Sequence, residues 1–231
     1  MRQIIALGGG GFSMEPDRFI HIETIQENYS KDFFIPTASG DSDHYISRFY
    51  NFFNKQKCKP SHLSLFKPLT RDLEAFILEK DIIYVGGGNT RNLLVLWKEW
   101  GVDHILRKAW NEGIVLAGIS AGSICWFEEG VTDSFGEKLE PIKCLGFLKG
   151  SHCPHSDGEL DRRPSYNRLI YSGDIQPGIA ADDGIAIHYV EQNIGNIVSS
   201  RPNAKACQVY LDNRVVKVIE EELQPNFLGS Y

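Results

Sequence analysis

A glycine-bounded segment near the middle of the chain carries the residue with the clearest potential for chemistry. Residues 118–122 read Gly-Ile-Ser-Ala-Gly, the G-x-S-x-G pattern in which a serine sits on a sharp turn between a strand and a helix. Residues 114–117 are wholly apolar, as expected for a strand buried on both faces, and a helix over 123–129 is expected to follow. Such a turn strains the serine backbone and lifts its hydroxyl above the sheet edge. The pattern therefore predicts that Ser120 is a nucleophile.

A serine nucleophile needs a base, normally a histidine, and an acid that fixes the tautomer of that base. Of the seven histidines, His155 lies in a punctuated loop, residues 151–158, which follows the apolar run 145–148. Parallel α/β proteins place their sites at strand ends of this kind. His155 is therefore the candidate base, and His152 in the same loop is its immediate competitor.

Four carboxylates follow the serine turn and are candidates for the acid: Glu128, Glu129, Asp133 and Glu137. Glu128 and Glu129 end the expected helix, where a charged pair usually forms a solvated face. Asp133 lies in the segment 131–134, a loop that could return over the sheet. Composition leaves all four open.

Acyl transfer also needs backbone N–H donors for the oxyanion. The amide of Ala121, directly after the serine, is one natural donor, and the glycine-rich segment 87–89 can supply the second because glycine lets a backbone approach a ligand closely. Nucleotide binding is disfavoured for both glycine loops. Residues 8–13 lack the last glycine of G-x-G-x-x-G, and the chain has no Gly-Lys-Ser/Thr.

Alternating apolar runs and amphipathic segments predict the elements that position these residues. The pattern over the first two-thirds is typical of a parallel sheet wrapped by helices. Strands are expected at 4–7, 33–35, 63–66, 82–85 and 114–117; helices are expected around 46–53, from Thr70, over 93–100 with a stop at Gly101, and up to Asn111. We expect Trp97 and Trp100 both to pack in the core. The last third is β-rich, with runs at 185–190, 194–198, 207–211 and 215–219 and a hairpin turn at Asp212-Asn213.

Composition describes one globular domain over residues 1–231, with 42% hydrophobic residues and a formal charge of −6. A nucleic-acid footprint needs a basic stripe and is not expected. The five cysteines form no CxxC pair, which favours reduced thiols. The amino-terminal apolar run is too short for a signal peptide, and no run approaches the ~20 apolar residues that span a bilayer. We therefore expect a cytoplasmic protein without membrane segments.

Four segments occur together and in a specific order: Ile-Ile-Ala-Leu-Gly-Gly-Gly-Gly at 4–11, Val-Gly-Gly-Gly-Asn-Thr at 85–90, the serine turn at 118–122, and Pro154-His155. Together they resemble the peptidase E (aspartyl dipeptidase) family of serine peptidases, within the class I glutamine amidotransferase-like superfamily. The resemblance implies an α/β three-layer sandwich, with a mostly parallel sheet flanked by helices and a β-rich carboxyl-terminal portion ending in a hairpin.

The same resemblance implies roles for individual residues. Ser120 would be the nucleophile, His155 the base and Asp133 the acid, while the amides of Gly88 and Ala121 would bind the oxyanion. Because related members place a glutamate in the segment that holds the acid, the two glutamates before Asp133 stay open.

The implied substrate is a short peptide, cleaved by a dipeptidase through an acyl-enzyme and preferred when its amino-terminal residue is acidic. Asn89, Arg162 and Arg163 would contact it, with arginine holding the carboxylate. No metal or organic cofactor is required, and the chain would act as a monomer or homodimer. The alternatives are a cyanophycinase-like peptidase that cuts aspartyl-arginine polymers and a catalytically inactive, ligand-binding amidotransferase-like domain.

Overall fold

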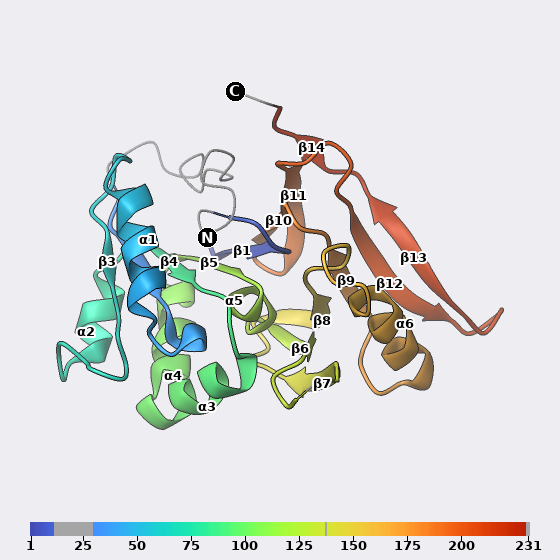
Figure 1. Cartoon of the computed structure of the whole chain (residues 1–231), viewed down its shortest axis with the longest axis horizontal. Helices are drawn as coiled ribbons and strands as arrows, with labels where there is room; N and C mark the ends of the chain where they lie inside the picture. Colours follow the sequence, from blue (N-terminus) through green and yellow to red (C-terminus); the bar gives the residue numbers. More distant parts are fainter. Residues whose placement is uncertain (12–29, 137, 230–231) are drawn as a thin grey trace.

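The computed structural model describes residues 1–11, 30–136 and 138–229. Within these residues the strands form two sheets flanked by helices (Figure 1). The larger sheet has eight strands, in the spatial order β14 (Asn226–Phe227), β11 (Asn193–Ser199), β10 (Ile185–Val190), β1 (Gln3–Leu7), β5 (Val115–Ile119), β4 (Ile82–Val85), β2 (Asp32–Ile35) and β3 (Ser61–His62). The smaller sheet has six, in the order β13 (Lys217–Leu223), β12 (Ala206–Asp212), β9 (Gly178–Ala181), β8 (Leu148–Cys153), β6 (Phe127–Thr132) and β7 (Glu140–Lys143).

The larger sheet is mostly parallel, as the sequence predicts. Strands β1, β5, β4, β2 and β3 run in one direction, and β10 is antiparallel to β1. The carboxyl ends of parallel strands meet at one edge of a sheet. Consequently the glycine loop after β1, the glycine loop after β4 and the serine turn after β5 lie side by side along that edge.

Helices cover both faces of this sheet, which gives the expected three layers. Alternate residues of a strand point to opposite faces. Ile5 and Leu7 of β1 therefore pack in a cluster with Phe49 and Phe53 of α1 (Asp43–Phe53). Ile4 and Ala6 face the cluster that holds the apolar side chains of α2 (Leu73–Leu78), α3 (Thr90–Trp100) and α4 (Val102–Asn111).

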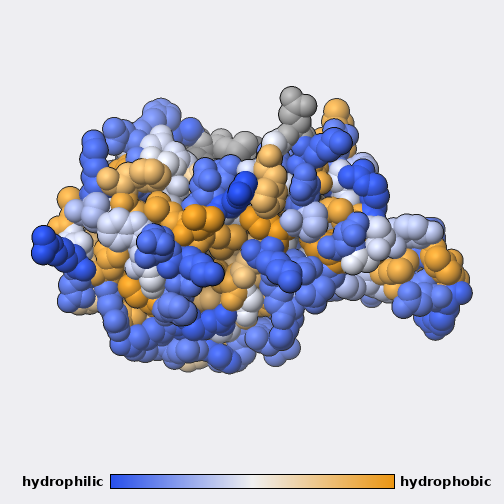
Figure 2. Space-filling model, turned by 90° about the horizontal axis from the view of Figure 1, so that it is seen from below, coloured by the Kyte–Doolittle hydropathy of each residue, from blue (hydrophilic) through white to orange (hydrophobic). Residues whose placement is uncertain are grey.

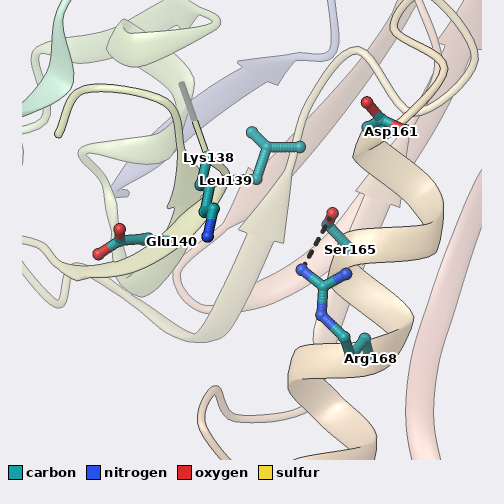
Figure 3. Close-up of a pocket in the computed structure, with 6 residues that line it drawn as sticks. All are labelled: Lys138, Leu139, Glu140, Asp161, Ser165 and Arg168. Atoms are coloured by element: carbon teal, nitrogen blue, oxygen red, sulfur yellow. Dashed lines mark hydrogen bonds between the residues drawn. The ribbon is translucent and has the colours of Figure 1, made fainter. Parts of the chain in front are cut away.

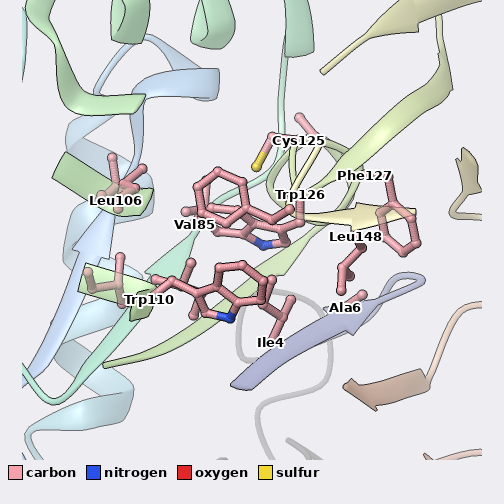
Figure 4. Close-up of a cluster of buried hydrophobic side chains, with 14 of the residues drawn as sticks. Ile4, Ala6, Val85, Leu106, Trp110, Cys125, Trp126, Phe127 and Leu148 are labelled. Atoms are coloured by element: carbon pink, nitrogen blue, oxygen red, sulfur yellow. The ribbon is translucent and has the colours of Figure 1, made fainter. Parts of the chain in front are cut away.

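A single apolar cluster joins the two sheets (Figure 4). Its members include Ile4 and Val85 of the larger sheet and Phe127 and Leu148 of the smaller one. Trp126 is fully buried among them, with its ring centroid 5.5 Å from that of Phe147. The opposite face of the smaller sheet packs against α6 (Arg162–Ser172) in a separate cluster. The two sheets are thus held together beneath the loops at their carboxyl ends.

The terminal hairpin forms as predicted. β12 and β13 pair antiparallel, with Asp212 opposite Lys217, so residues 213–216 make the turn and the second strand begins at Lys217. The hairpin projects beyond the body of the molecule, and its tip carries apolar residues (Figure 2). Val215 and Val216 at the tip are exposed.

The largest departure from the sequence prediction follows Ser120. The expected helix over 123–129 is only the short α5 (Ala121–Ile124), and β6 then begins at Phe127. The reason is tertiary pairing, because Leu145 N–H bonds the Cys125 carbonyl and Phe147 N–H bonds the Trp126 carbonyl. These partners come from distant sequence and outweigh the local helical tendency.

Smaller differences concern element boundaries. The third strand is β3, just before the predicted run 63–66. The helix predicted from Thr70 begins at Leu73, after Asp72 accepts the N–H of Ala75 as its cap. Trp97 is fully buried as expected, whereas Trp100 is 40% exposed and the prediction of a core position for it was wrong. All five cysteines are free thiols, and none of the described helices has the length and apolar character needed to cross a bilayer.

The close approach of α5 to β4 generates a stability prediction. A Cβ at Gly122 would lie 2.2 Å from the Val85 carbonyl oxygen, so Gly122→Ala forces backbone apart and should lower the free energy of unfolding by at least about 2 kcal/mol. Gly173→Ala is the matched control, because Gly173 has a φ of 77° but nothing within 4 Å of its Cβ position; it should cost about 1 kcal/mol. Urea denaturation measures both. Equal losses would contradict the steric argument.

Candidate active site

Ser120 occupies a strained turn at the carboxyl end of β5. Its φ is 56° and ψ is −118°, a conformation that non-glycine residues rarely adopt. The two flanking glycines make the turn possible. A Cβ at Gly118 would lie 2.0 Å from the Gly122 carbonyl oxygen, and Gly122 itself lies against Val85. The serine side chain is therefore held at the sheet edge, at the start of α5.

The second glycine loop runs beside the Ser120 side chain. A Cβ at Gly87 would lie 3.2 Å from Ser120 Cβ and 3.7 Å from its Oγ, so the Gly87–Gly88 peptide borders the hydroxyl. Gly88 has a φ of 139°, and its Cβ position is 2.2 Å from the Ala38 carbonyl oxygen, which leaves no room for a side chain. The Ala121 N–H belongs to the first turn of α5, where amides have no acceptor within the helix. Backbone of the second glycine loop and the start of α5 thus both lie next to the Ser120 side chain.

His155 follows β8 in the smaller sheet but is anchored to the larger one. Its backbone N–H donates to the Gly8 carbonyl at 3.1 Å. Gly8 directly follows β1, and β1 lies next to β5 with Leu7 opposite Ile119. Because neighbouring strands are about 4.8 Å apart, this bond places His155 beside the Ser120 turn. The side chain of His155 is 16% exposed.

The carboxylate that contacts His155 is Asp183. Its Oδ1 lies 2.6 Å from His155 Nδ1, which leaves Nε2 as the nitrogen directed elsewhere. The hydrogen bond from His155 keeps the pKa of Asp183 below its usual range, against an opposing contribution from burial. Register explains the contact: Cys153 at the end of β8 lies opposite Ala180 of the parallel strand β9, so the loops after both strands meet.

The glycine loop after β1 packs directly on this pair. A Cβ at Gly9 would lie 1.7 Å from Asp183 Oδ1 and 2.7 Å from His155 Nδ1. The Gly184 N–H donates to the Gly9 carbonyl at 3.0 Å. The run of glycines at the start of the chain is therefore needed for close approach to the histidine and aspartate.

Three of the four candidate acids lie elsewhere, and the fourth, Glu137, lies outside the described residues. Asp133 is exposed, in a loop whose next residue, Ser134, accepts the Thr90 N–H at 2.8 Å. Glu128 and Glu129 lie on strand β6, where Glu128 binds Lys149 Nζ and Glu129 accepts the Gln176 N–H. Asp183 was not among the residues predicted from sequence. Its signal was an Asp-Asp-Gly turn between two apolar runs, residues 182–184.

His152, the competitor of His155, lies in the core. It is fully buried in β8, its ring stacks on Phe127 with centroids 4.6 Å apart, and its Nδ1 lies 3.0 Å from the Ile179 carbonyl oxygen. Burial lowers the pKa of His152 to about 3. This histidine is therefore neutral and inaccessible.

The residues expected to contact substrate have partners within the chain. Asn89 caps α3 by accepting the Asn92 N–H at 2.9 Å. Arg162 is 4% exposed and binds Glu159 and the Val131 carbonyl, whereas Arg163 pairs with Glu220 on β13. Each of the two guanidinium groups already faces a carboxylate.

A cavity of about 520 Å³ lies between the start of β7 and α6 (Figure 3). Both signs of charge line it, with Lys138 and Glu140 on one wall, Asp161 just before α6 and Arg168 on that helix. Arg168 donates to Ser165 Oγ at 3.3 Å. The residues that line this cavity do not include Ser120, His155 or Asp183, so it is separate from that group of residues.

Comparison with known proteins identifies the family. Residues 4–197 match the sequence model of peptidase family S51. The chain belongs to peptidase family S51. It is 57% identical over 233 residues to an uncharacterised peptidase, YgaJ, of Bacillus subtilis (strain 168), and the match covers 99% of this chain and 100% of that protein. Membership of this family makes the protein a serine peptidase, hence a hydrolase, as the sequence resemblance predicted.

Two solved structures share the fold of this S51 peptidase. A peptidase from an acI-B1 Actinobacterium superposes with a TM-score of 0.67 at 16% identity, covering 98% of this chain and 95% of that one. A putative peptidase E protein from Listeria monocytogenes EGD-e gives a TM-score of 0.61 at 17% identity, covering 97% and 100%. At these identities the likeness concerns the fold alone.

Burial of His152 predicts how the stability of this S51 peptidase depends on pH. The folded pKa of about 3 lies below the usual 6.5, so between these values the unfolded chain binds a proton that the folded chain does not. The contribution of His152 to the free energy of unfolding should therefore be fully present above about pH 6.5, and it should decrease as the pH falls towards 3. Urea denaturation at pH 7.5, 6 and 5 measures this slope.

Two variants isolate the contribution of His152. His152→Gln should make the slope shallower without abolishing it, because burial also lowers the pKa of His62 and His188. His104→Gln is the control, since its side chain is 91% exposed, and it should keep the wild-type slope. The same slope in both variants would show that His152 titrates normally in the folded protein.

Proposed function

We propose that the protein hydrolyses short peptides with a triad of Ser120, His155 and Asp183. The observation that carries the proposal is the 2.6 Å contact between His155 Nδ1 and Asp183 beside the strained serine turn. Asp183 takes the role that sequence reasoning gave to Asp133. An aspartate on Nδ1 holds the imidazole in the tautomer whose Nε2 accepts a proton, and it stabilises the imidazolium that forms.

The chemistry follows from these roles. His155 Nε2 removes the Ser120 hydroxyl proton while Oγ attacks the peptide carbonyl, and the imidazolium then gives that proton to the leaving amine. Water, deprotonated by the same nitrogen, then attacks the acyl-enzyme carbonyl; the carboxylic acid product leaves and the imidazolium returns the proton to Ser120 Oγ. The lowered pKa of Asp183, caused chiefly by its bond to His155, keeps this carboxylate ionised at neutral pH.

The oxyanion is assigned to the amides of Gly88 and Ala121. Gly87 lies against Ser120 Oγ, so the next amide along the chain, that of Gly88, is close to the reacting centre. The following amide, on Asn89, already donates to the Ala38 carbonyl at 2.8 Å. Donors held by backbone packing need no reorganisation as charge develops, which is the main benefit of such a site.

For the substrate, we propose short peptides, with dipeptides as the smallest members. An acidic amino-terminal residue would need a free cation, and Arg162 and Arg163 are both engaged by glutamates of the chain. The net charge of −6 also repels an acidic peptide. The proposal therefore excludes a strong acidic preference based on these two arginines.

Reaction with a fluorophosphonate probe tests the triad. Wild-type protein should be labelled on Ser120, as located by peptide mapping, and Ser120→Ala should not be labelled. Asp183→Asn should reduce peptide turnover by about 10³- to 10⁴-fold, because asparagine favours the wrong imidazole tautomer.

Asp133→Asn is the matched control for this experiment. It makes the same chemical change on an exposed loop, and it should leave turnover within about twofold of wild type. A large loss in Asp133→Asn, together with normal turnover in Asp183→Asn, would reverse the assignment of the acid. Unlabelled wild-type protein, under conditions that label a control hydrolase, would refute the serine mechanism.

Substrate preference is tested with dipeptides that differ only in the first residue. Hydrogen bonds to a charged partner are worth about 1.5–3 kcal/mol, so a free arginine should favour Asp over isosteric Asn by tenfold or more. We expect a ratio of kcat/KM for Asp-Leu over Asn-Leu below about tenfold. A ratio of about 100 that collapses in Arg163→Gln would show instead that Arg163 leaves Glu220 to bind substrate.

A further inference from the structure

Charged side chains form hydrogen bonds with both the backbone N–H and the backbone carbonyl of Asp183. Its N–H donates to Asp157 Oδ1 at 2.9 Å, and its carbonyl accepts from Arg201 Nη1 at 3.0 Å. The same Nη1 lies 2.9 Å from Asp157 Oδ2, which closes the ring. Three segments far apart in sequence are thus tied together at this one residue.

The stem of Arg201 is fixed as well as its guanidinium. Gly184 has a φ of 80°, and a Cβ there would lie 2.9 Å from Arg201 Cγ and Cδ, so the stem packs on the bare glycine. Next to it, the Ser200 N–H donates to the Gly184 carbonyl at 2.9 Å. The turn that carries Asp183 therefore packs against Ser200 and Arg201, which follow β11.

The side chain of Asp183 has little freedom once its peptide is held. Gly9 lies against Oδ1, and a Cβ at Gly158 would lie 2.5 Å from Oδ2. Asp157, which precedes Gly158, is in the loop that begins at His155, where the Gly158 N–H donates to the His155 carbonyl at 3.2 Å. The ring formed by Arg201 and Asp157 consequently links the base-bearing loop to the acid-bearing loop.

We propose that Arg201 is a positioning residue for the reaction. By bridging Asp157 and the Asp183 carbonyl, it holds the Asp183 carboxylate at hydrogen-bonding distance from His155 Nδ1. This inference rests on the proposed function. Arg201 lies outside residues 4–197, the part of the chain matched by the family model, so the assignment comes from this structure alone.

The contribution is geometric rather than a large stabilising energy. The side chains of Arg201 and Asp157 are 37% and 30% exposed, and ion pairs this open to water add little to stability. Catalysis is far more sensitive, because a displacement of about 1 Å can cost about 10²-fold in rate. Loss of the bridge should therefore lower kcat with little effect on folding.

Steady-state kinetics of Arg201→Gln test the proposal. We expect kcat for a dipeptide to fall by about 10- to 100-fold, while KM changes by less than about threefold. Arg201→Lys keeps the charge but offers a single ammonium in place of the guanidinium fork, so it should fall between wild type and Arg201→Gln. Arg214→Gln is the matched control, because it removes an exposed arginine paired with Asp212 on the hairpin, and it should leave kcat unchanged.

A double-mutant cycle separates positioning from general structural support. If Arg201 acts through Asp183, Arg201→Gln should produce no further loss of activity in an Asp183→Ala background. An equal loss in that background, or wild-type kcat in Arg201→Gln alone, would overturn the proposal. Normal activity in Asp183→Asn would instead overturn the proposed triad, so the two failures are distinguishable.

A second variant keeps the proposal testable if Arg201→Gln fails to fold. Asp157→Asn breaks the same bridge from its other end and leaves Arg201 in place. It should give a similar fall in kcat, and combining it with Arg201→Lys should add little. Thermal unfolding of each variant checks that the fold is retained. Full activity in a folded Asp157→Asn variant would contradict a role for the bridge.

Discussion

The architecture of this peptidase depends on backbone segments that touch without side chains between them. At the serine turn, Gly118 lies against Gly122, and Gly122 lies against the Val85 carbonyl. This contact brings α5 down onto β4 and β5 and holds Ser120 in a conformation that an isolated chain would avoid. Packing of the two sheets on one apolar cluster, with Trp126 inside it, stabilises the strained turn. Strain at Ser120 is thus sustained by the packed core.

The proposed catalytic groups lie where the two sheets meet. Ser120 belongs to the larger sheet, whereas His155 and Asp183 follow neighbouring strands of the smaller one. The glycine loop after β1 connects them, because the Gly8 carbonyl accepts the His155 N–H and the Gly9 carbonyl accepts the Gly184 N–H. The position of the proposed base relative to the proposed nucleophile is therefore set by main-chain hydrogen bonds.

The arginines of this region differ in the partners that they bind. Arg162 and Arg163 bind glutamates and a backbone carbonyl, and so tie α6 to β6 and β13. Arg201 instead bridges two loops at the proposed triad. The negative net charge of the chain makes such pairing easy, since carboxylates outnumber cationic side chains. An arginine that lies near a site in sequence is consequently a weak indicator of carboxylate recognition.

Sequence alone determined the features that depend on local residue patterns. These include the parallel sheet, the helices on both faces, the hairpin, the serine turn and the loop of His155. It did not reveal Asp183, because parallel pairing of β8 with β9 joins that residue to a histidine 28 positions away. Nor did it reveal that β6 replaces a helix after Cys125, since the partners of that strand lie in later segments. Periodicity reports which residues are buried, but only the tertiary register decides which carboxylate meets which imidazole.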